Sequence, residues 1–136
     1  MIYLIDGTQK TELSTSRFEL GSITDVVEYC STKEVLGVDT ETEGFDFTCK
    51  KMIMFQIGDK DKQFVVDTRV VDIEPLRDIL ESKSIIKIFH NAKFDYKFIR
   101  RWGKIQCEGI YDTFLTERVL NCGKDNVKYG LKDVCK

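Results

Sequence analysis

The sequence lacks the patterns that are typical of zinc-binding, secreted and membrane-spanning proteins. Its five cysteines are scattered and contain no C-x-x-C pair, which argues against a structural zinc site. An odd number of unpaired cysteines favours reduced thiols, and we expect a cytoplasmic protein, or one in the host cytoplasm if it is viral. No apolar run approaches the length of a membrane span, and no basic leader of a signal peptide precedes the first strand pattern.

An excess of basic charge is also missing. Lysine and arginine number 21 against 23 aspartates and glutamates, which gives a net charge of −2 and a pI near 5.5. This balance argues against a protein that holds nucleic acid by bulk positive charge. It is compatible with an enzyme that binds nucleic acid locally, through metal ions and a few basic residues. The 136 residues, with 42% hydrophobic content, suit one globular domain with a real core.

Hydrophobic periodicity predicts an α/β protein. Strands are expected at residues 2–6, 18–20, 34–39, 51–58, 63–67, 84–89 and 106–111, and helices at 22–30, 72–81, 92–102, from 112 onward and at 127–136. We expect the first two strands to form a hairpin in an N-terminal segment, 1–21, ahead of a main domain at 22–136. The other five predict a mixed sheet with helices on both faces. Ser22 with Asp25 forms a capping-box pattern, and Asp112 is placed as an N-cap, with a functional role as the alternative.

Two carboxylates end the strand at 34–39. Asp39 and Glu41 are two residues apart, so in a strand their side chains leave the same face. Like charges held this close repel each other unless a cation lies between them, and Mg²⁺ or Mn²⁺ prefers such hard oxygen ligands. The alternative is an exposed acidic turn that follows a strand.

A third carboxylate falls on the inward face of the helix at 92–102. Its apolar stripe of Phe98, Ile99 and Trp102 continues backward to Asp95 and Asn91. A buried carboxylate needs a cation, a donor or water. The alternative is a first-turn aspartate that faces solvent and favours the helix dipole. If the strands before these motifs are neighbours, three carboxylates converge at one edge of the sheet.

Two segments carry a resemblance to a known family. VDTETEGFD, at 38–46, and HNAKFDYKFI, at 90–99, resemble the first two motifs of the DEDD 3′–5′ exonucleases. The strongest likeness is to the proofreading domains of family A DNA polymerases, followed by ribonuclease D relatives. The resemblance covers residues 22–136 and implies a ribonuclease H-like fold. It also implies removal of nucleotides from the single-stranded or frayed 3′ end of DNA, or of RNA, with a polymerase domain possible in the full-length protein.

The resemblance also implies roles for individual residues. Two divalent ions, Mg²⁺ or Mn²⁺, are held by the catalytic Asp39, Glu41 and Asp95. The residues expected to contact the nucleic acid are Thr40, Phe45, Asn91 and Phe94. Phe45 matches a position where an apolar side chain wedges against the terminal base, and core packing is its alternative. For His90, a structural role is expected over that of a general base.

The family's third motif has the form Y-x-x-x-D or H-x-x-x-D. Tyr129 and Asp133 match it literally, but YGLKDVC at 129–135 resembles the stretch that precedes the true motif. We therefore expect Asp133 to be a decoy and the true motif to lie beyond Lys136, and hydrolysis by this chain to be weak or absent as a result. A catalytically incomplete binding or structural module of the same fold is the second hypothesis. A phosphotransferase with a nucleophilic Asp39 is the third, and it leaves Asn91 and Asp95 unexplained.

Overall fold

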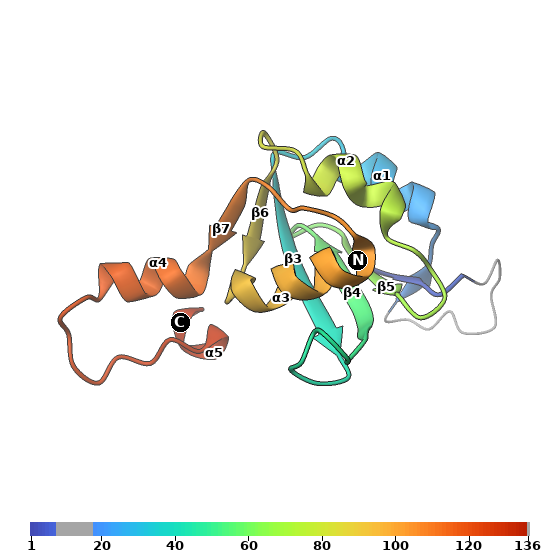
Figure 1. Ribbon diagram of the computed structural model, residues 1–136. Coiled ribbons are helices and arrows are strands. Elements are labelled where there is room, and N and C mark those ends of the chain that lie inside the picture. The colour runs from blue at the N-terminus through green and yellow to red at the C-terminus, as the bar shows by residue number, and fades with distance from the viewer. Residues whose placement is uncertain (8–17, 136) are drawn as a thin grey trace.

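A computed structural model describes residues 1–7 and 18–135 of the chain and contains one seven-stranded mixed sheet (Figure 1). The strands are β1 (Ile2–Ile5), β2 (Glu19–Leu20), β3 (Val35–Thr42), β4 (Met52–Gly58), β5 (Gln63–Asp67), β6 (Ile86–Phe89) and β7 (Ile110–Asp112), in the order β2-β1-β5-β4-β3-β6-β7. The helical elements are α1 (Ile23–Cys30), the 3-10 turn η1 (Glu74–Leu76), α2 (Arg77–Leu80), α3 (Ala92–Phe98), the π-helical turn η2 (Ile99–Gly103), α4 (Thr113–Leu120) and α5 (Leu131–Val134).

Strand β3 lies inside the sheet, antiparallel to β4 and parallel to β6. The predicted hairpin of β4 and β5 is confirmed, with residues 59–62 as its turn. The predicted N-terminal hairpin is wrong, because β1 runs parallel to both β2 and β5. The apolar run of β1 fills the open edge of β5 and buries Ile5, and an apolar pattern carries no information about strand direction. Both N-terminal strands thus belong to the common sheet.

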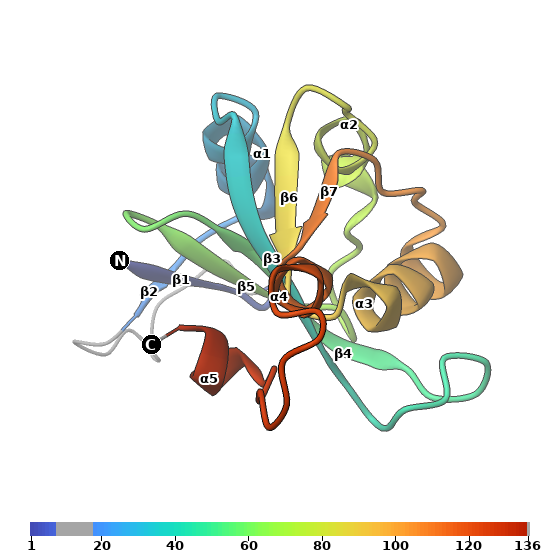
Figure 2. The ribbon, with the colours of Figure 1, turned by 90° about the vertical axis from the view of Figure 1, so that its left-hand side faces the viewer.

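Helices cover both faces of the sheet, as predicted. Figures 1 and 2 show α1, α2 and α3 on one face, and α4 with α5 on the other. The core lies on the first of these faces. It includes Val26 and Cys30 of α1, Leu36 and Val38 of β3, Phe55 and Ile57 of β4, Leu76, Ile79 and Leu80 of η1 and α2, and Phe98 and Ile99 after β6. Helix α4 contributes no buried residue.

The helix boundaries have local causes. Ser22 accepts from the backbone of Asp25 while Asp25 accepts from the backbone of Ser22, so the predicted capping box at α1 is confirmed. Asp112 is the N-cap of α4, as predicted. The helix predicted at 72–81 is divided into η1 and α2, and only Leu131–Val134 is helical in the last predicted segment.

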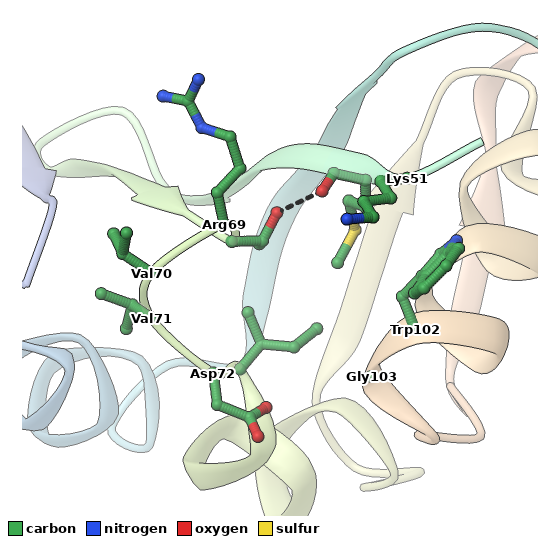
Figure 3. Close-up of a pocket in the computed structure, with 10 residues that line it drawn as sticks. Lys51, Arg69, Val70, Val71, Asp72, Trp102 and Gly103 are labelled. Atoms are coloured by element: carbon green, nitrogen blue, oxygen red, sulfur yellow. Dashed lines mark hydrogen bonds between the residues drawn. The ribbon is translucent and has the colours of Figure 1, made fainter.

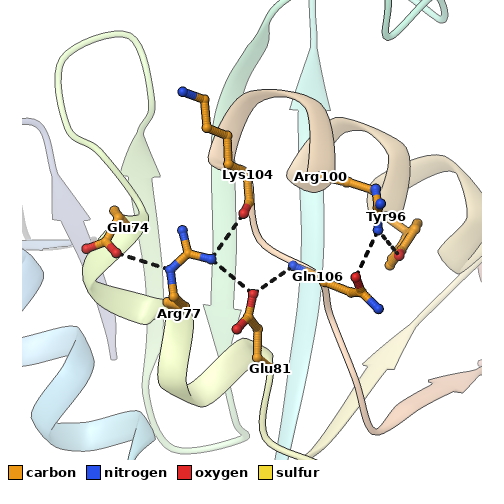
Figure 4. Close-up of polar contacts among 7 residues, drawn as sticks. All are labelled: Glu74, Arg77, Glu81, Tyr96, Arg100, Lys104 and Gln106. Atoms are coloured by element: carbon orange, nitrogen blue, oxygen red, sulfur yellow. Dashed lines mark hydrogen bonds and ion pairs between the residues drawn. The ribbon is translucent and has the colours of Figure 1, made fainter.

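Polar side chains join α2 to the segment that follows η2 (Figure 4). Arg77 bridges Glu74 and Glu81 and donates to the carbonyl of Lys104, and Glu81 accepts from the backbone N–H of Gln106. These contacts attach the segment after α3 and η2 to helix α2. No described helix is long and apolar enough to cross a membrane.

Candidate active site

Strand β3 presents two carboxylates on one face and buries the residue between them. Asp39 and Glu41 are exposed, whereas Thr40 is only 6% exposed. Burial alternates along the whole strand, as the two-residue period of a strand requires. The predicted placement of Asp39 and Glu41 on a common face is therefore confirmed.

Asp95 is buried in the first turn of α3, with an exposed fraction of 3%. Its Oδ1 accepts hydrogen bonds from the backbone N–H of Thr40 at 3.0 Å and from the Thr40 hydroxyl at 2.7 Å. Burial raises the pKa of Asp95 to about 6, the bonds from Thr40 oppose the rise, and the negative charge of Asp39 adds to it. The inward orientation predicted for Asp95 is confirmed, and the solvent-facing alternative is wrong.

The sheet topology explains how Asp95 reaches β3. The two motif-bearing strands are neighbours, as expected, but β6 pairs with β3 only as far as Gly37 and Ile88. Strand β3 continues to Thr42, so its edge beyond this pair lies open to the element that follows β6. That element is α3, and its first turn places the Asp95 carboxylate against the open edge.

The three carboxylates supply suitable donors for a metal ion but do not form a closed cage. Among residues 1–7 and 18–135, no group of three or more His, Cys, Asp or Glu is arranged to hold a metal. Asp95 and Asp39 are close enough to interact electrostatically. Mg²⁺ is commonly bound through one or two carboxylates together with waters and substrate phosphates, so this donor set fits a magnesium ion that the substrate helps to hold.

No metal-holding group that includes Asp133 is found among the described residues. Asp133 lies in α5, beyond a loop in which the Tyr129 ring packs edge-on against Phe114 at 6.2 Å. The expectation that Tyr129 and Asp133 are a decoy thus remains a prediction.

The residues expected to contact nucleic acid differ in their accessibility. Phe45 is 91% exposed and its ring meets that of Phe94 edge-on at 6.1 Å, so the core-packing alternative for Phe45 is wrong. Phe94 is half-buried and packs against Phe98. Asn91 is exposed at the start of α3. Thr40 is buried with its hydroxyl directed at Asp95, a positioning role that the sequence did not indicate.

His90 has the structural environment expected from the sequence. Its Nδ1 lies 2.9 Å from the Thr113 hydroxyl, and its ring packs edge-on against Phe114 at 5.8 Å. The Thr113 hydroxyl also donates to the carbonyl of Phe89 at 3.1 Å, which ties His90 to the end of β6. His90 and Asp39 line one side of a cavity of about 660 Å³ between the sheet and α5.

A second cavity, of about 440 Å³, lies away from these carboxylates (Figure 3). It is bounded by Lys51, the segment from Thr68 to Ile73, and Trp102 with Gly103 at the end of η2. The Arg69 guanidinium turns away from it and forms an ion pair with Asp67 at 2.6 Å. None of the predicted site residues lines this cavity.

A family model described as 3′-5′ exonuclease matches residues 16–136. The chain belongs to the 3′–5′ exonuclease family. The match includes both acidic motifs, at β3 and at α3, and so covers every predicted site residue.

The curated relatives include an exosome component and a ribonuclease. Exosome complex component 10 of Homo sapiens is 24% identical over 118 residues, which cover 85% of this chain and 13% of the relative. Ribonuclease D of Nitrobacter hamburgensis is 28% identical over 124 residues, which cover 87% of this chain and 30% of the relative. The chain thus spans less than a third of the length of either relative.

Solved structures confirm the fold expectation. NrnC of Brucella melitensis bound to pGG superimposes with a TM-score of 0.70 at 19% identity, over 98% of this chain and 57% of that one. The same protein with bound Mg²⁺ gives a TM-score of 0.69 at 18% identity, over 98% and 58% of the two chains. At these identities the likeness establishes the fold alone, an α/β fold of the ribonuclease H-like type.

Proposed function

We propose that this chain is a metal-dependent 3′–5′ exonuclease domain that removes nucleotides from the 3′ end of single-stranded RNA. The carrying observation is the meeting of Asp95 with the strand that bears Asp39 and Glu41, within a chain of the exonuclease family. Isolated acidic pairs are common on protein surfaces. A buried carboxylate that has a raised pKa and is hydrogen-bonded to the strand carrying such a pair is uncommon. Groups with shifted pKa values concentrate at functional sites.

Each acidic residue has a proposed part. Asp39 and Glu41 would bind divalent ions directly from the exposed face of β3, and Asp95 would bind from the open edge of the strand. Bound Mg²⁺ or Mn²⁺ would activate a water and neutralise charge at the scissile phosphate. Thr40 keeps Asp95 oriented through its two hydrogen bonds. Whether one ion or two are bound is part of the test below.

Aromatic and basic side chains beside α3 support a single-stranded substrate. Phe45 offers an exposed ring at the site, on which a base can stack whatever its identity. Lys97 of α3 lies over the Phe47 ring, and Arg101 of η2 lies over the Trp102 ring. The Trp102 indole donates to the carbonyl of Lys50, which holds the 43–50 loop against the helix.

RNA is proposed ahead of DNA because the relatives are an exosome component and a ribonuclease D by name. The proofreading role and the polymerase partner expected from the sequence have no counterpart in these relatives. We retain single-stranded DNA as a substrate to be compared. The five cysteines are all free thiols, which supports a reducing compartment such as the cytoplasm.

Hydrolysis of labelled oligonucleotides tests the proposal. With Mg²⁺ or Mn²⁺, the chain should shorten a 5′-labelled RNA one nucleotide at a time from its 3′ end, slowly because Asp133 is not expected to serve as a ligand of the third motif, and EDTA should stop it. Asp39→Ala and Asp95→Ala should abolish hydrolysis, whereas Asp78→Ala, on the exposed side of α2, should leave it unchanged. Calorimetric titration with Mn²⁺ should give the number of ions bound. Absence of metal binding to the wild type, both alone and with a bound oligonucleotide, would overturn the proposal.

A catalytically incomplete module is the second candidate, favoured by the absence of a three-carboxylate cluster in the described residues. It predicts binding of single-stranded oligonucleotides without shortening, even with Mn²⁺. The hydrolysis assay, together with a binding measurement on the same oligonucleotide, therefore separates the enzyme from the module.

A further inference from the structure

The carboxylate of Asp112 accepts hydrogen bonds from backbone N–H groups at the starts of two helices. Oδ1 of Asp112 accepts from Asn91 at 3.0 Å, from Phe114 at 2.9 Å and from Leu115 at 3.4 Å. Its Oδ2 accepts from Ala92 at 2.9 Å. Phe114 and Leu115 belong to α4, which Asp112 caps in the ordinary way, whereas Asn91 and Ala92 begin α3, 20 residues earlier in the chain.

Helix α3 has no N-cap side chain of its own. Asn91 occupies the cap position in a left-handed conformation, with φ of 69° and ψ of 52°, and its side chain makes no capping bond. Among residues other than glycine, asparagine and aspartate tolerate this conformation best. It lets the consecutive N–H groups of Asn91 and Ala92 reach the two oxygens of one carboxylate. The cap of α3 is therefore supplied by β7.

The strand pairing brings this cap into place. Asp112 ends β7 in register with Phe89, which ends β6, and only two residues separate Phe89 from α3. Thr113 reinforces the junction because its hydroxyl donates to the carbonyl of Phe89. The negative charge of Asp112 also lies at the positive ends of both helix dipoles.

The cap lies one helical turn from the proposed catalytic acid. Asp95 follows Ala92 by three residues, and its carboxylate is bound to Thr40 on β3. The first turn of α3 is thus held at two points, by Asp112 from one side and by Thr40 from the other. Without the first anchor, the turn could unwind or shift along the β3 edge.

We propose that Asp112 is a positioning residue of the active site, which fixes the meeting of Asp95 with β3 by capping α3 from the neighbouring strand. Its effect on hydrolysis rests on the proposed function, and its effect on the first turn of α3 does not. Supporting groups of this kind change metal affinity or activity by about 10–100-fold when they are removed.

The variant Asp112→Asn keeps the oxygen that accepts from Asn91, Phe114 and Leu115 and replaces the one that accepts from Ala92. Asparagine is a good N-cap, so its oxygen can still accept from Phe114. Its amide group cannot accept from Ala92. Amide hydrogen exchange by NMR in EDTA should show lost protection at Ala92 and Thr40, with Phe114 still protected. Asp112→Ser, which also keeps one cap oxygen, is the second variant if the first folds poorly.

Ser22→Ala is the matched control, because it removes the cap of α1, a helix that holds none of the site residues. It should destabilise α1 while Thr40 stays protected. In the hydrolysis assay, Asp112→Asn should lower kcat about 10–100-fold with KM for a short RNA little changed. Unchanged exchange at Ala92 and Thr40, or equal loss in the control, would overturn the proposal. An inactive wild type would overturn the exonuclease function alone, because the exchange measurements need no catalysis.

Discussion

Thr40 donates both its backbone N–H and its hydroxyl to a single oxygen of Asp95, at 3.0 and 2.7 Å. Thr40 lies between the two exposed acids of β3, so the strand carries ligand candidates on one face and the support for a third on the other. The acidic pair and the buried acid are thereby coupled through the backbone of one strand. A change at Thr40 should consequently act on Asp95 while the carboxylates of Asp39 and Glu41 stay unaltered.

Replacing Thr40 by valine tests this coupling. The variant keeps the shape of the side chain and removes one hydrogen bond to a buried carboxylate, which is typically worth about 1.5–3 kcal/mol when the acceptor is charged. We expect a loss of that size in the free energy of unfolding at pH 8, measured with urea in EDTA. The loss should shrink at pH 4, where Asp95 is protonated.

Thr48→Val is the control, since that exposed hydroxyl donates to the exposed Asp46 at 2.6 Å. It should cost under about 1 kcal/mol at either pH, in line with other exposed charge-assisted contacts. Equal losses from the two variants at pH 8 would contradict a special role for Thr40.

Asp95→Asn should change the pH dependence of stability in the metal-free protein. A carboxyl group with a pKa of about 6 when folded and near 4 when unfolded binds more protons in the folded state between these values. Stability contributed by this group is therefore full below pH 4 and is lost as the pH rises through 6, by about 3 kcal/mol in all. Asparagine does not ionise and can still accept from Thr40.

The variant should accordingly be more stable than the wild type at pH 8, by up to about 3 kcal/mol, and similar to it near pH 4. Urea unfolding in EDTA at several pH values measures this, with Asp78→Asn as the exposed control. Parallel profiles for Asp95→Asn and wild type would refute the raised pKa. Added Mn²⁺ should increase the free energy of unfolding of the wild type more than that of Asp95→Asn.

Local sequence patterns predicted most elements of this fold. The five strands β3 to β7 and the capping box at Ser22 follow from apolar periodicity and N-cap chemistry. The direction of β1 does not, because parallel pairing with β5 depends on residues some 60 positions apart. Only one of the two caps that Asp112 supplies could be predicted from the sequence. Its position before α4 is a local signal, but its bonds to Asn91 and Ala92 require β6 and β7 to be neighbours.

The candidate site divides in the same way. The spacing of Asp39 and Glu41 gave their common face, and the helical stripe through Phe98 gave the inward direction of Asp95. The hydrogen bonds from Thr40 depend on the short length of β6, which leaves the edge of β3 open. Nothing in the strand pattern at 84–89 indicates where that pairing stops.

Lys87 is a further case in which tertiary structure satisfies a residue that the pattern leaves unexplained. It is fully buried in β6, and its ammonium donates to the carbonyls of Ile79 and Ile85 at 3.1 and 2.7 Å and to that of Ser82. Burial lowers its pKa. Lys87→Met should leave these carbonyls without their donor and cost about 3 kcal/mol or more, by the usual penalty for unsatisfied buried groups.

Urea unfolding at pH 7 measures that loss, and Lys83→Met supplies the control because Lys83 is exposed on the same connection. The control should change the free energy of unfolding by no more than about 0.5 kcal/mol. A Lys87→Met protein as stable as the wild type would show that water or a backbone shift replaces the ammonium.

Phe45→Ala should separate substrate binding from stability. The side chain is 91% exposed and its ring meets that of Phe94 edge-on at 6.1 Å, so its removal should alter the free energy of unfolding by at most about 0.5 kcal/mol. Stacking of a base on an aromatic ring contributes about 1–3 kcal/mol. We therefore expect about 5–150-fold weaker binding of a single-stranded oligonucleotide, measured by fluorescence anisotropy with Ca²⁺ in place of Mg²⁺.

Because stacking involves the base and not the sugar, RNA and DNA of one sequence should lose affinity by the same factor. Val70→Ala is the control, since Val70 is also an exposed apolar residue but lines the cavity that excludes the predicted site residues. It should bind as the wild type does. Undiminished affinity in Phe45→Ala would place the terminal base elsewhere, whereas a loss confined to RNA would point to a contact with the 2′-hydroxyl in place of stacking.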